Sequence, residues 1–290
     1  MAMEQQLKAG GIARSAREKA AEWAKPGVKM LDLAEKIEQY VTEQGGKPAF
    51  PVNLSVNNSA AHYTPTADDA AVVGEKDVLK IDLGVHVEGF IVDTAFTIDF
   101  SGEQGKLVEA AEEALQAALA VMKAGVNAKE VGAAIQAAIT ARGFKPVENL
   151  CGHLLEPWVL HAGVEIPNLP VYGQELQEGE VYAVEPFATT GQGRVREDGG
   201  FCEIYSVVFP KNVRMPASRR VLEIVAEEYR ALPFAKRWLQ EISMLQLAVG
   251  DLQKQGVLHA YPLLRDVEGS LVAQAETTVE VEEDGVKVLC

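Results

Sequence analysis

The amino-acid sequence predicts an α+β protein with two related halves, in which helices cover one side of a sheet and the other side is open to solvent or ligand. Three observations support this prediction. A pair of helices occurs twice in the first half of the chain, strand-like segments follow each pair, and several of these segments carry carboxylate or imidazole groups among apolar residues.

The helical pairs form an internal repeat with an offset of 98 residues. Each copy contains a helix that runs into a glycine turn and a second helix that ends at the glycine before a Lys-Pro pair. The matching positions are Lys25, Gly27, Val28, Gly45, Lys47 and Pro48 in the first copy and Lys123, Gly125, Val126, Gly143, Lys145 and Pro146 in the second. Equal spacing over a whole structural unit predicts a pseudo-twofold architecture.

Apolar residues in both copies recur at helical spacing, so each helical pair has one face to bury. These residues are Leu33, Ile37, Tyr40 and Val41 in the first copy and Ala111, Leu115, Leu119 and Met122 in the second. The segments after each pair are rich in Val, Ile, Leu and Phe and bounded by Gly, Pro and Asn, which predicts strands. The expected order is helices, strands, helices, strands.

The pattern becomes more charged and more helical beyond residue 196. We expect helical stretches at Arg219 to Arg230 and at Phe234 to Ala248, followed by a last strand from Ser270 to Val281. The chain is therefore expected to divide into a main domain and an inserted helical subdomain. The main domain comprises residues 1–196 and 263–290, and the inserted subdomain comprises residues 197–262.

Composition argues against several classes of protein. The formal net charge of −15 argues against wrapping of nucleic acid, which needs clustered Lys and Arg, although a local basic patch is compatible with it. Three cysteines without CxxC spacing argue against a disulfide framework and a cysteine zinc site. A polar amino terminus and the lack of a long apolar run predict a cytoplasmic protein without a signal peptide or a membrane span.

The segment from Val78 to Asp99 predicts two strands joined by a tight turn at Glu88-Gly89. With that turn, Asp82 faces Ala95 and shares a face with Asp93, its diagonal neighbour at about 7 to 8 Å. A pair of metal ions between the two carboxylates would relieve their repulsion. Two alternatives stay open: a three-residue turn would place the aspartates on opposite faces, and an exposed edge strand would point them to water.

Further candidate ligands follow in the second half of the chain. His153 and His161 flank a turn at Glu156-Pro157, so a hairpin would set their imidazoles nearly opposite each other. Two later strand-like segments add Glu185 and Glu276. Imidazole with several carboxylates suits Co, Mn, Fe or Zn. A single histidine is more often a core or surface residue, so only the ensemble predicts a metal site.

The three remaining histidines lie outside this group. His62 is in the loop from Ala61 to Pro65, after an Asn-rich stretch, and a loop histidine near a cleft is a candidate general acid or base. We assign His86 and His259 to structure or surface.

Seven short motifs connect these residues to a known family: Lys47 to Asn53, Ala61 to Pro65, Lys80 to His86 with Gly89 to Thr97, Gly152-His153 with Leu160 to Gly163, Ala183 to Thr189, Thr190-Gly191 and Leu232 to Phe234. In this combination the chain resembles the type II methionine aminopeptidases of the archaeal sort, which have the pita-bread fold. The resemblance covers essentially all 290 residues. It implies a pseudo-twofold, curved antiparallel sheet covered by helices, with the inserted subdomain as the mark of type II.

The resemblance also implies an activity, namely removal of the initiator methionine from nascent proteins whose second residue is small. Two divalent ions (Co, Mn, Fe or Zn) would be held, with Asp82 on one ion, Asp93 and Glu276 bridging, and His153 and Glu185 on the other. A hydroxide between the ions would attack the scissile carbonyl, and Glu185 would pass a proton to the leaving amine.

The same resemblance implies a substrate pocket and a setting. His161 would stabilise the oxyanion, His62 would contact the leaving amide or the second residue, and Phe50 would form a wall of the methionine pocket. The expected partners are the N-termini of nascent polypeptides, close to the ribosome but without direct contact to nucleic acid. We expect a monomer that does not bind membranes.

Two places depart from the family pattern. The family has Phe-Glu-His at the last ligand, where this chain has Ala275-Glu276-Thr277. Strand alternation also puts Glu280 on the same face as Glu276, so a slipped register would make Glu280 the ligand. The stretch from Val195 to Phe201, at the start of the insertion, is the second departure.

Two other functions are compatible with the same motifs. The nearest is another peptidase of this fold, a prolidase or X-Pro aminopeptidase, against which the His62 loop and the late insertion argue. The other is a non-catalytic binding module on the same fold. Competent residues at all five ligand positions argue against that module.

Overall fold

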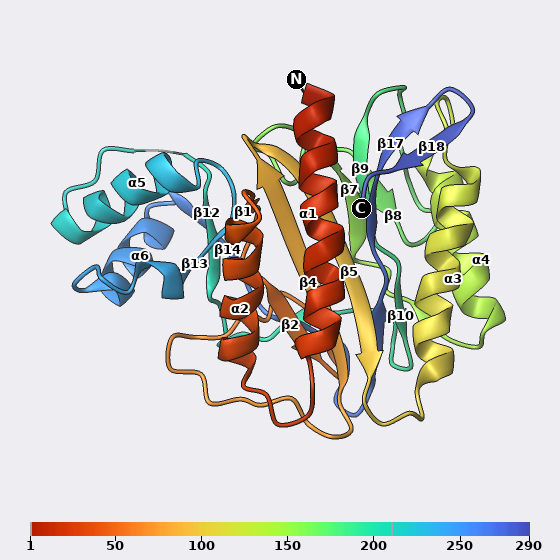
Figure 1. Cartoon of the computed structure of the whole chain (residues 1–290), viewed down its shortest axis with the longest axis horizontal. Helices are drawn as coiled ribbons and strands as arrows, with labels where there is room; N and C mark the ends of the chain where they lie inside the picture. Colours follow the sequence, from red (N-terminus) through yellow and green to blue (C-terminus); the bar gives the residue numbers. More distant parts are fainter. Residues whose placement is uncertain (1, 210) are drawn as a thin grey trace.

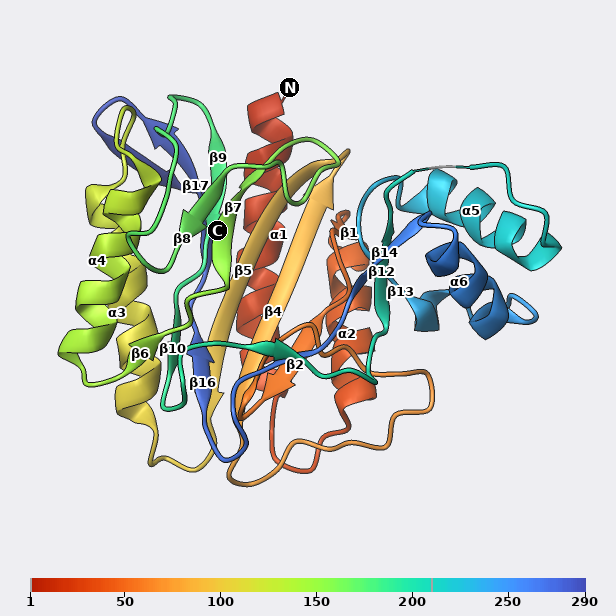
Figure 2. The same cartoon turned by 180° about the vertical axis from the view of Figure 1, so that it is seen from behind.

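The computed structural model describes residues 2–209 and 211–290 of the chain. The two helical pairs of the repeat are α1 (Ala2–Trp23), α2 (Met30–Glu43), α3 (Gly105–Val121) and α4 (Ala128–Ala141). Figure 1 shows α1 and α2 in front of the strands and α3 and α4 at their right-hand side, and Figure 2, seen from behind, shows the long strands in front of α1 and α2. The predicted α+β class and the one-sided helical layer are confirmed.

The first half of the chain forms an antiparallel sheet with the order β1-β4-β2, in which β5 pairs with the other edge of β4. Its two long strands form one hairpin, and β3 follows β2 directly in the chain. The bounds are β1 (Lys47–Pro48), β2 (Asn53–Val56), β3 (Ser59–Ala61), β4 (Val78–Val87) and β5 (Phe90–Asp99).

The second half forms two sheets, with the orders β18-β17-β9-β7-β8 and β16-β10-β6. The last strands of the chain therefore pair with strands from its middle. The bounds are β6 (Lys145–Pro146), β7 (Cys151–Leu155), β8 (Glu165–Pro167), β9 (Val181–Val184), β10 (Phe187–Thr189), β16 (Val272–Gln274), β17 (Thr277–Glu282) and β18 (Gly285–Val288).

The internal repeat is visible in equivalent backbone features of the two halves. Gly45 and Gly143 both follow the second helix of their pair, with φ values of 84° and 83°. Each then leads into a two-residue Lys-Pro strand, β1 or β6, that pairs with a longer strand of its own half. The left-handed conformation ends the helix, and glycine adopts it without strain. The predicted pseudo-twofold repeat is confirmed.

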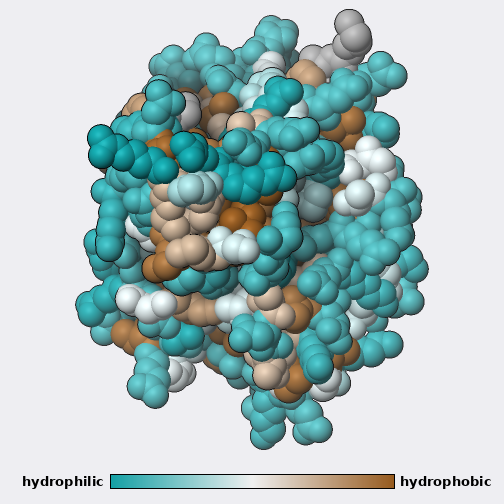
Figure 3. Space-filling view, turned by 90° about the vertical axis from the view of Figure 1, so that its left-hand side faces the viewer, coloured by the Kyte–Doolittle hydropathy of each residue, from teal (hydrophilic) through white to brown (hydrophobic). Residues whose placement is uncertain are grey.

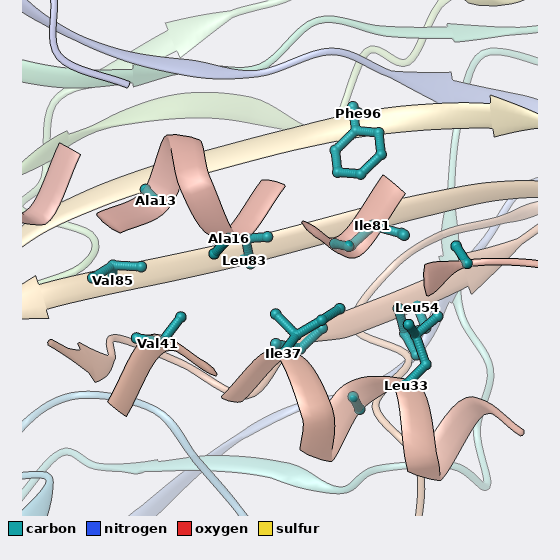
Figure 4. Packing of buried hydrophobic residues seen from close by; sticks show 14 of the residues in the cluster. Ala13, Ala16, Leu33, Ile37, Val41, Leu54, Ile81, Leu83, Val85 and Phe96 are labelled. Atoms are coloured by element: carbon teal, nitrogen blue, oxygen red, sulfur yellow. The ribbon is translucent and has the colours of Figure 1, made fainter. Parts of the chain in front are cut away.

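The core lies between the helices and the strands. Small residues of α1, such as Ala13 and Ala16, let that helix approach the sheet closely, while α2 contributes larger residues such as Leu33 and Ile37 (Figure 4). Alternate residues of β4 fill the same core, namely Leu79, Ile81, Leu83 and Val85. Because strand side chains alternate between faces, Lys80 and Asp82 must point to the other face.

The segment predicted as a helical insertion also contains strands. It comprises β12 (Ile204–Val207), α5 (Pro216–Glu228), β13 (Phe234–Ala235), the 3-10 helix η1 (Lys236–Leu239), α6 (Leu245–Lys254) and β14 (Leu258–Tyr261). The strands form the sheet β13-β12-β14, and a separate hydrophobic cluster joins that sheet to α5 and α6. The face of the molecule at this end is mostly hydrophilic, with small hydrophobic areas (Figure 3).

Two short strands bracket that segment. Strand β11 (Arg196–Glu197) leads into it, β15 (Leu264–Arg265) leads out, and the two pair with each other. Asp198 N donates to Leu263 O at 2.8 Å, which extends the pairing. We infer that residues 197–262 form an inserted subdomain and that residues 1–196 and 263–290 form the main domain.

Two sequence-based element predictions were wrong in part. The helix expected from Phe234 to Ala248 is interrupted, because Phe234 and Ala235 pair with β12 and Met244 is left-handed with φ 63°. Tertiary pairing overrides helix propensity here. The helix expected at Arg219 to Arg230 corresponds to α5, but α5 begins earlier, at Pro216, and ends earlier, at Glu228.

The last strand, expected from Ser270 to Val281, is divided into β16 and β17. The backbone leaves its neighbours at Ala275 and Glu276. Ala275 N donates to Pro186 O at 3.2 Å and Glu276 N donates to Ala95 O at 3.0 Å. This break places Glu276 against β5 of the first half, where a regular strand would have continued along β9 and β10.

Candidate metal centre

The β4–β5 hairpin has the two-residue turn that the sequence predicts. Glu88 and Gly89 both have positive φ values, 53° and 92°, and Val87 pairs with Phe90 across the turn. The register places Asp82 opposite Ala95 and Asp93 opposite Gly84. Both aspartates line one cavity on the face away from the helices, so the three-residue turn and the exposed edge strand are excluded.

Side chains from three strand regions meet beside this cavity, and Asp93 and His153 line it. One potential ligand atom each from Asp93, His153 and Glu276 lies within 4.8 Å of the other two. His153 Nε2 is 3.7 Å from Asp93 Oδ2 and 3.9 Å from Glu185 Oε1. With Asp82 on the same cavity wall, the five residues that the sequence singles out lie around one point.

Glu276, and not Glu280, is the glutamate at this point. The break between β16 and β17 buries Glu276 to 1% exposure beside Asp93 and His153. The carboxylate of Glu280 instead lies 3.5 Å from Lys287 Nζ on the neighbouring strand β18. The slipped register left open by strand alternation is therefore excluded.

The carboxylates repel one another in a buried environment. Burial raises the pKa of Asp82 to about 7. Burial, followed by repulsion from neighbouring carboxylates, raises the pKa values of Asp93, Glu185 and Glu276 well above their usual range. Burial, with the nearby His161, lowers the pKa of His153. Without a cation nearby, these groups favour their uncharged forms. A bound metal cation would favour the ionised carboxylates instead.

The donor set fits divalent metal ions. Asp82 Oδ1 and Asp93 Oδ1 are buried and have no hydrogen-bond partner among the residues that the structure describes. Buried carboxylate oxygens without partners are costly, and metal coordination is one of the few ways to satisfy them. One imidazole with four carboxylates is a ligand set for ions such as Mn, Fe, Co or Zn.

A buried amide, which the sequence did not single out, supports the carboxylates. Gln274 is 2% exposed, and its Nε2 donates to Glu185 Oε2 at 3.2 Å and to Glu276 Oε2 at 3.3 Å. Thr97 Oγ1 holds the main chain of Gln274 on both sides, because it donates to the carbonyl at 2.7 Å and accepts from the N–H at 2.9 Å. An alternating strand pattern gives no signal for such an amide.

The two remaining candidate histidines lie further out in the cavity. The ring of His161 contacts that of His153, with centroids 4.4 Å apart, and Nδ1 of His62 lies 3.1 Å from Pro262 O. Burial lowers the pKa values of His62 and His161 to about 4, so both imidazoles are neutral at neutral pH. A neutral imidazole can donate one hydrogen bond and accept another.

The hairpin expected between His153 and His161 has a different register. Glu156 pairs with Val159 in a tight turn, but the Cα partner of His153 is Glu165 in β8. The imidazoles are therefore not opposite each other on paired strands. They meet because the chain from Leu160 to Gly163 curls back over β7, with Ala162 N donating to Leu154 O at 2.9 Å.

The assignment of His259 to structure or surface was incomplete. His259 is exposed but lines the mouth of the cavity, where its ring lies 4.6 Å from that of Tyr261. Tyr261 also contacts His62 and His161, at 5.7 and 6.0 Å between ring centroids. Both residues come from β14, whose approach to the His62 loop depends on the fold. His86 is buried against Trp158, as its structural assignment predicts.

The cavity has a volume of about 380 Å³. Its inner wall carries the aspartates, and its apolar walls include Phe50, Leu160 and Ile204. Phe50 can lie there only because residue 84 is a glycine, since a Cβ at Gly84 would be 2.3 Å from the Phe50 ring. A volume of this order suits a small apolar ligand group.

Comparisons with known proteins agree with this geometry. The model of metallopeptidase family M24 matches residues 4–213. The methionine aminopeptidase of Pyrococcus horikoshii is 50% identical over 293 aligned residues, which cover 99% of each chain. The structure of a thermophilic Arx1 superposes with a TM-score of 0.89 at 17% identity, covering 99% of this chain and 90% of that chain.

A methionine aminopeptidase from Thermotoga maritima has a TM-score of 0.72 at 23% identity and covers 99% of this chain and 95% of that chain. At such identities the structural matches establish the fold alone, and they confirm the predicted pita-bread architecture. The sequence match over nearly the full length goes further, because it extends through the segments that carry all five metal-site residues. The chain belongs to metallopeptidase family M24 and, within it, to the methionine aminopeptidases.

Proposed function

We propose that this chain is a type II methionine aminopeptidase, a metallohydrolase that removes an N-terminal methionine when the second residue is small. The observation that carries this proposal is the convergence of Asp93, His153 and Glu276 within 4.8 Å, beside a cavity that Asp82, Asp93, His153 and Glu185 line. A buried group of carboxylates has no structural purpose that would offset its mutual repulsion.

Two divalent ions are the proposed occupants of this centre. Asp82, Asp93, His153, Glu185 and Glu276 would hold the ions. When bound, the ions supply an activated nucleophilic water and polarise the scissile carbonyl. The hydrogen bonds from Gln274 to Glu185 and Glu276 would keep those carboxylates oriented.

The residues of the chain itself would perform the remaining tasks. Glu185 would carry a proton toward the leaving amine, because its carboxylate lines the cavity beside His153. His161 would donate to the developing oxyanion, and such a donor contributes about 2.7 to 4 kcal/mol in comparable enzymes. His62 would contact the leaving amide or the second residue.

The apolar side of the cavity would bind the methionine side chain. Phe50 is the proposed wall of that pocket, since an apolar ring complements an unbranched thioether. Phe50 also packs in a cluster with Leu155, Leu160 and Leu232, so its position is fixed before substrate binds. A rigid wall favours one side-chain shape over others.

Partners and setting are part of the proposal. The substrates would be the N-termini of nascent polypeptides close to the ribosome, with the chain acting as a cytoplasmic monomer that does not contact nucleic acid directly. None of the helices in the described part of the chain is long and apolar enough to cross a membrane.

A peptide assay separates this function from its rivals. A chain reloaded with Mn²⁺ or Co²⁺ should release free methionine from Met-Ala-Ser and leave a Met-Arg peptide intact. A prolidase or X-Pro aminopeptidase would instead cleave Ala-Pro substrates, and a binding module would cleave neither class. Methionine release by the Asp93→Asn variant serves as the negative control, because that variant lacks one of the proposed metal-binding carboxylates.

A further inference from the structure

A lysine is buried close to the candidate metal centre, and no acidic side chain in the described part of the chain forms an ion pair with it. Lys80 is 1% exposed and lies two residues before Asp82 on the same face of β4. The lysine ion pairs of the described residues involve Lys19, Lys47, Lys236 and Lys287, and Lys80 is in none of them. A buried ammonium is costly unless dipoles or charges around it compensate for lost water.

Three backbone carbonyl groups surround the Lys80 ammonium. Nζ lies 2.8 Å from Val272 O, 3.2 Å from Asn57 O and 3.5 Å from Val78 O. An ammonium group has three donors and no acceptor, so its donors match the three oxygens in number. Carbonyl oxygens that replace a hydration shell are also how proteins hold Na⁺ and K⁺.

The three carbonyls come from separate parts of the chain that converge on the metal centre. Val272 begins β16, which leads through Gln274 to Glu276, and Val78 begins the strand of Asp82. Asn57 O, in the turn after β2, accepts from both Lys80 Nζ and Val272 N. The ammonium therefore links the two halves of the chain at one point.

Strand β16 depends on side chains for its attachment to β4 and β5. Its own sheet contains β10 and β6, not β4 or β5. Lys80 holds the start of β16, and Thr97, the Cα partner of Lys80 on β5, holds both main-chain groups of Gln274. The amide of Gln274 then contacts the carboxylates of Glu185 and Glu276.

We propose that the Lys80 ammonium acts as a built-in monovalent cation, which gathers three carbonyl groups and fixes β16, with Gln274 and Glu276, relative to Asp82. Lys80 is thus a positioning residue and touches no substrate. The role of Lys80 in positioning Glu276 rests on the proposed function. The cation site that the three carbonyl groups form does not depend on it. The competing explanation is that Lys80 only fills volume with its hydrocarbon stem.

The cation site predicts rescue by an external ion. Lys80→Ala removes the ammonium and leaves space, whereas Lys80→Met removes it and fills the space with apolar atoms. Lys76→Ala is the matched control, since Lys76 is exposed and its loss changes the net charge equally. The melting temperature of each metal-stripped variant is measured in potassium, sodium and tetramethylammonium chloride at equal ionic strength.

We expect Lys80→Ala to melt at a lower temperature in tetramethylammonium, which is too large for the site, and to recover by roughly 2 to 4 °C in potassium or sodium. Lys80→Met should be less stable than the wild type in every salt, and Lys76→Ala should follow the wild type. A Lys80→Ala response no larger than that of Lys76→Ala overturns the proposal. If Lys80→Ala does not fold, a Lys80→Met protein as stable as the wild type overturns it.

A second readout tests positioning. Calorimetric titration with Mn²⁺ should give an affinity roughly 10-fold weaker for Lys80→Ala in tetramethylammonium, and potassium should restore it. An affinity that is unchanged by the substitution would overturn the positioning role. A wild type that releases no methionine, while Lys80→Ala still responds to potassium, would refute the proposed activity and leave the cation site standing.

Discussion

The imidazoles of His153 and His161 lie edge to face, with ring centroids 4.4 Å apart. Their surroundings differ. His153 Nε2 faces the carboxylates of Asp93 and Glu185, whereas His161 lines the cavity beside it. Burial lowers the pKa of each, so neither competes with a metal ion through its own positive charge at neutral pH. We therefore propose that His153 serves as a metal ligand and His161 as a neutral donor.

His161→Ala should retain its metal and lose most of its turnover. Removal of one oxyanion donor costs about 10²- to 10³-fold in kcat in comparable enzymes. Metal content of the purified variant and kcat for Met-Ala-Ser check this prediction. Asp93→Asn is the contrasting variant, because it removes a buried ligand and should lose both metal and activity. Equal metal loss in the two variants would show that His161 is not a donor but a ligand.

Gln274→Ala should weaken metal binding while the five ligands stay in place. Its amide bonds to Glu185 and Glu276 would be lost, and loss of such supporting contacts typically costs about 10- to 100-fold in metal affinity. Mn²⁺ affinity by calorimetry is the measurement. Gln39→Ala is a suitable control, because the Gln39 amide bonds only to the exposed Glu43 among the described residues. A Mn²⁺ affinity equal to that of the control would show that the Gln274 amide does not support metal binding.

Buried Arg237 attaches the inserted segment to α2 through an ion pair and to the loop of His62 through a hydrogen bond. Arg237 in η1 contacts Glu38 of α2, and its Nη1 donates to Thr64 Oγ1 at 2.6 Å. Arg237→Met should destabilise the protein by about 3 to 5 kcal/mol, because Glu38 stays buried without its partner. The free energy of unfolding in denaturant gives the value.

The double variant Arg237→Met with Glu38→Leu provides the control for that prediction. Removing both charges leaves no unpaired charge, although Val52 N and Trp238 Nε1 lose the Glu38 acceptor, so the loss should be clearly smaller than the sum of the two single losses. Additive losses would mean that the pair is not coupled.

His86 should make the protein less stable in acid. Burial, followed by the charges of Lys47 and Arg230, lowers its pKa from 6.5 to about 4 in the folded state. Between these values the unfolded chain binds the proton and the folded chain does not, so stability falls as pH decreases from 6.5 to 4. The contribution of His86 is about 3 kcal/mol.

His86→Gln isolates that contribution, since an amide can still accept the hydrogen bond that Gly89 N donates to His86 Nδ1. The difference in unfolding free energy between wild type and variant should change through this pH range and be constant above it. Parallel curves would contradict the assignment. The other histidines affect both proteins equally and cancel in the difference.

Much of the fold was predictable because its signals are local. Gly45 and Gly143 end equivalent helices, and the Glu88-Gly89 turn fixes the register that brings Asp82 and Asp93 onto one face. These features depend on a few neighbouring residues. A two-residue turn leaves one register for the whole hairpin, so the local signal determines a long-range arrangement.

The rest depends on contacts between distant segments. The break at Glu276 exists because its N–H bonds to Ala95 of the first half, and the helix expected from Phe234 fails because that residue pairs with β12. Gln274 and Tyr261 reach the site through strands whose pairing partners lie far away in the sequence. No periodicity within a strand encodes such partners.

We propose that these side chains hold two catalytic metal ions, and a stepwise metal titration would decide whether they do. Mn²⁺ is added stepwise to the metal-stripped chain while bound metal and the release of methionine from Met-Ala-Ser are followed together. We predict binding of two ions per chain, with methionine release rising as the centre fills. Full release by the metal-stripped chain, or no Mn²⁺ binding at all, would contradict the account.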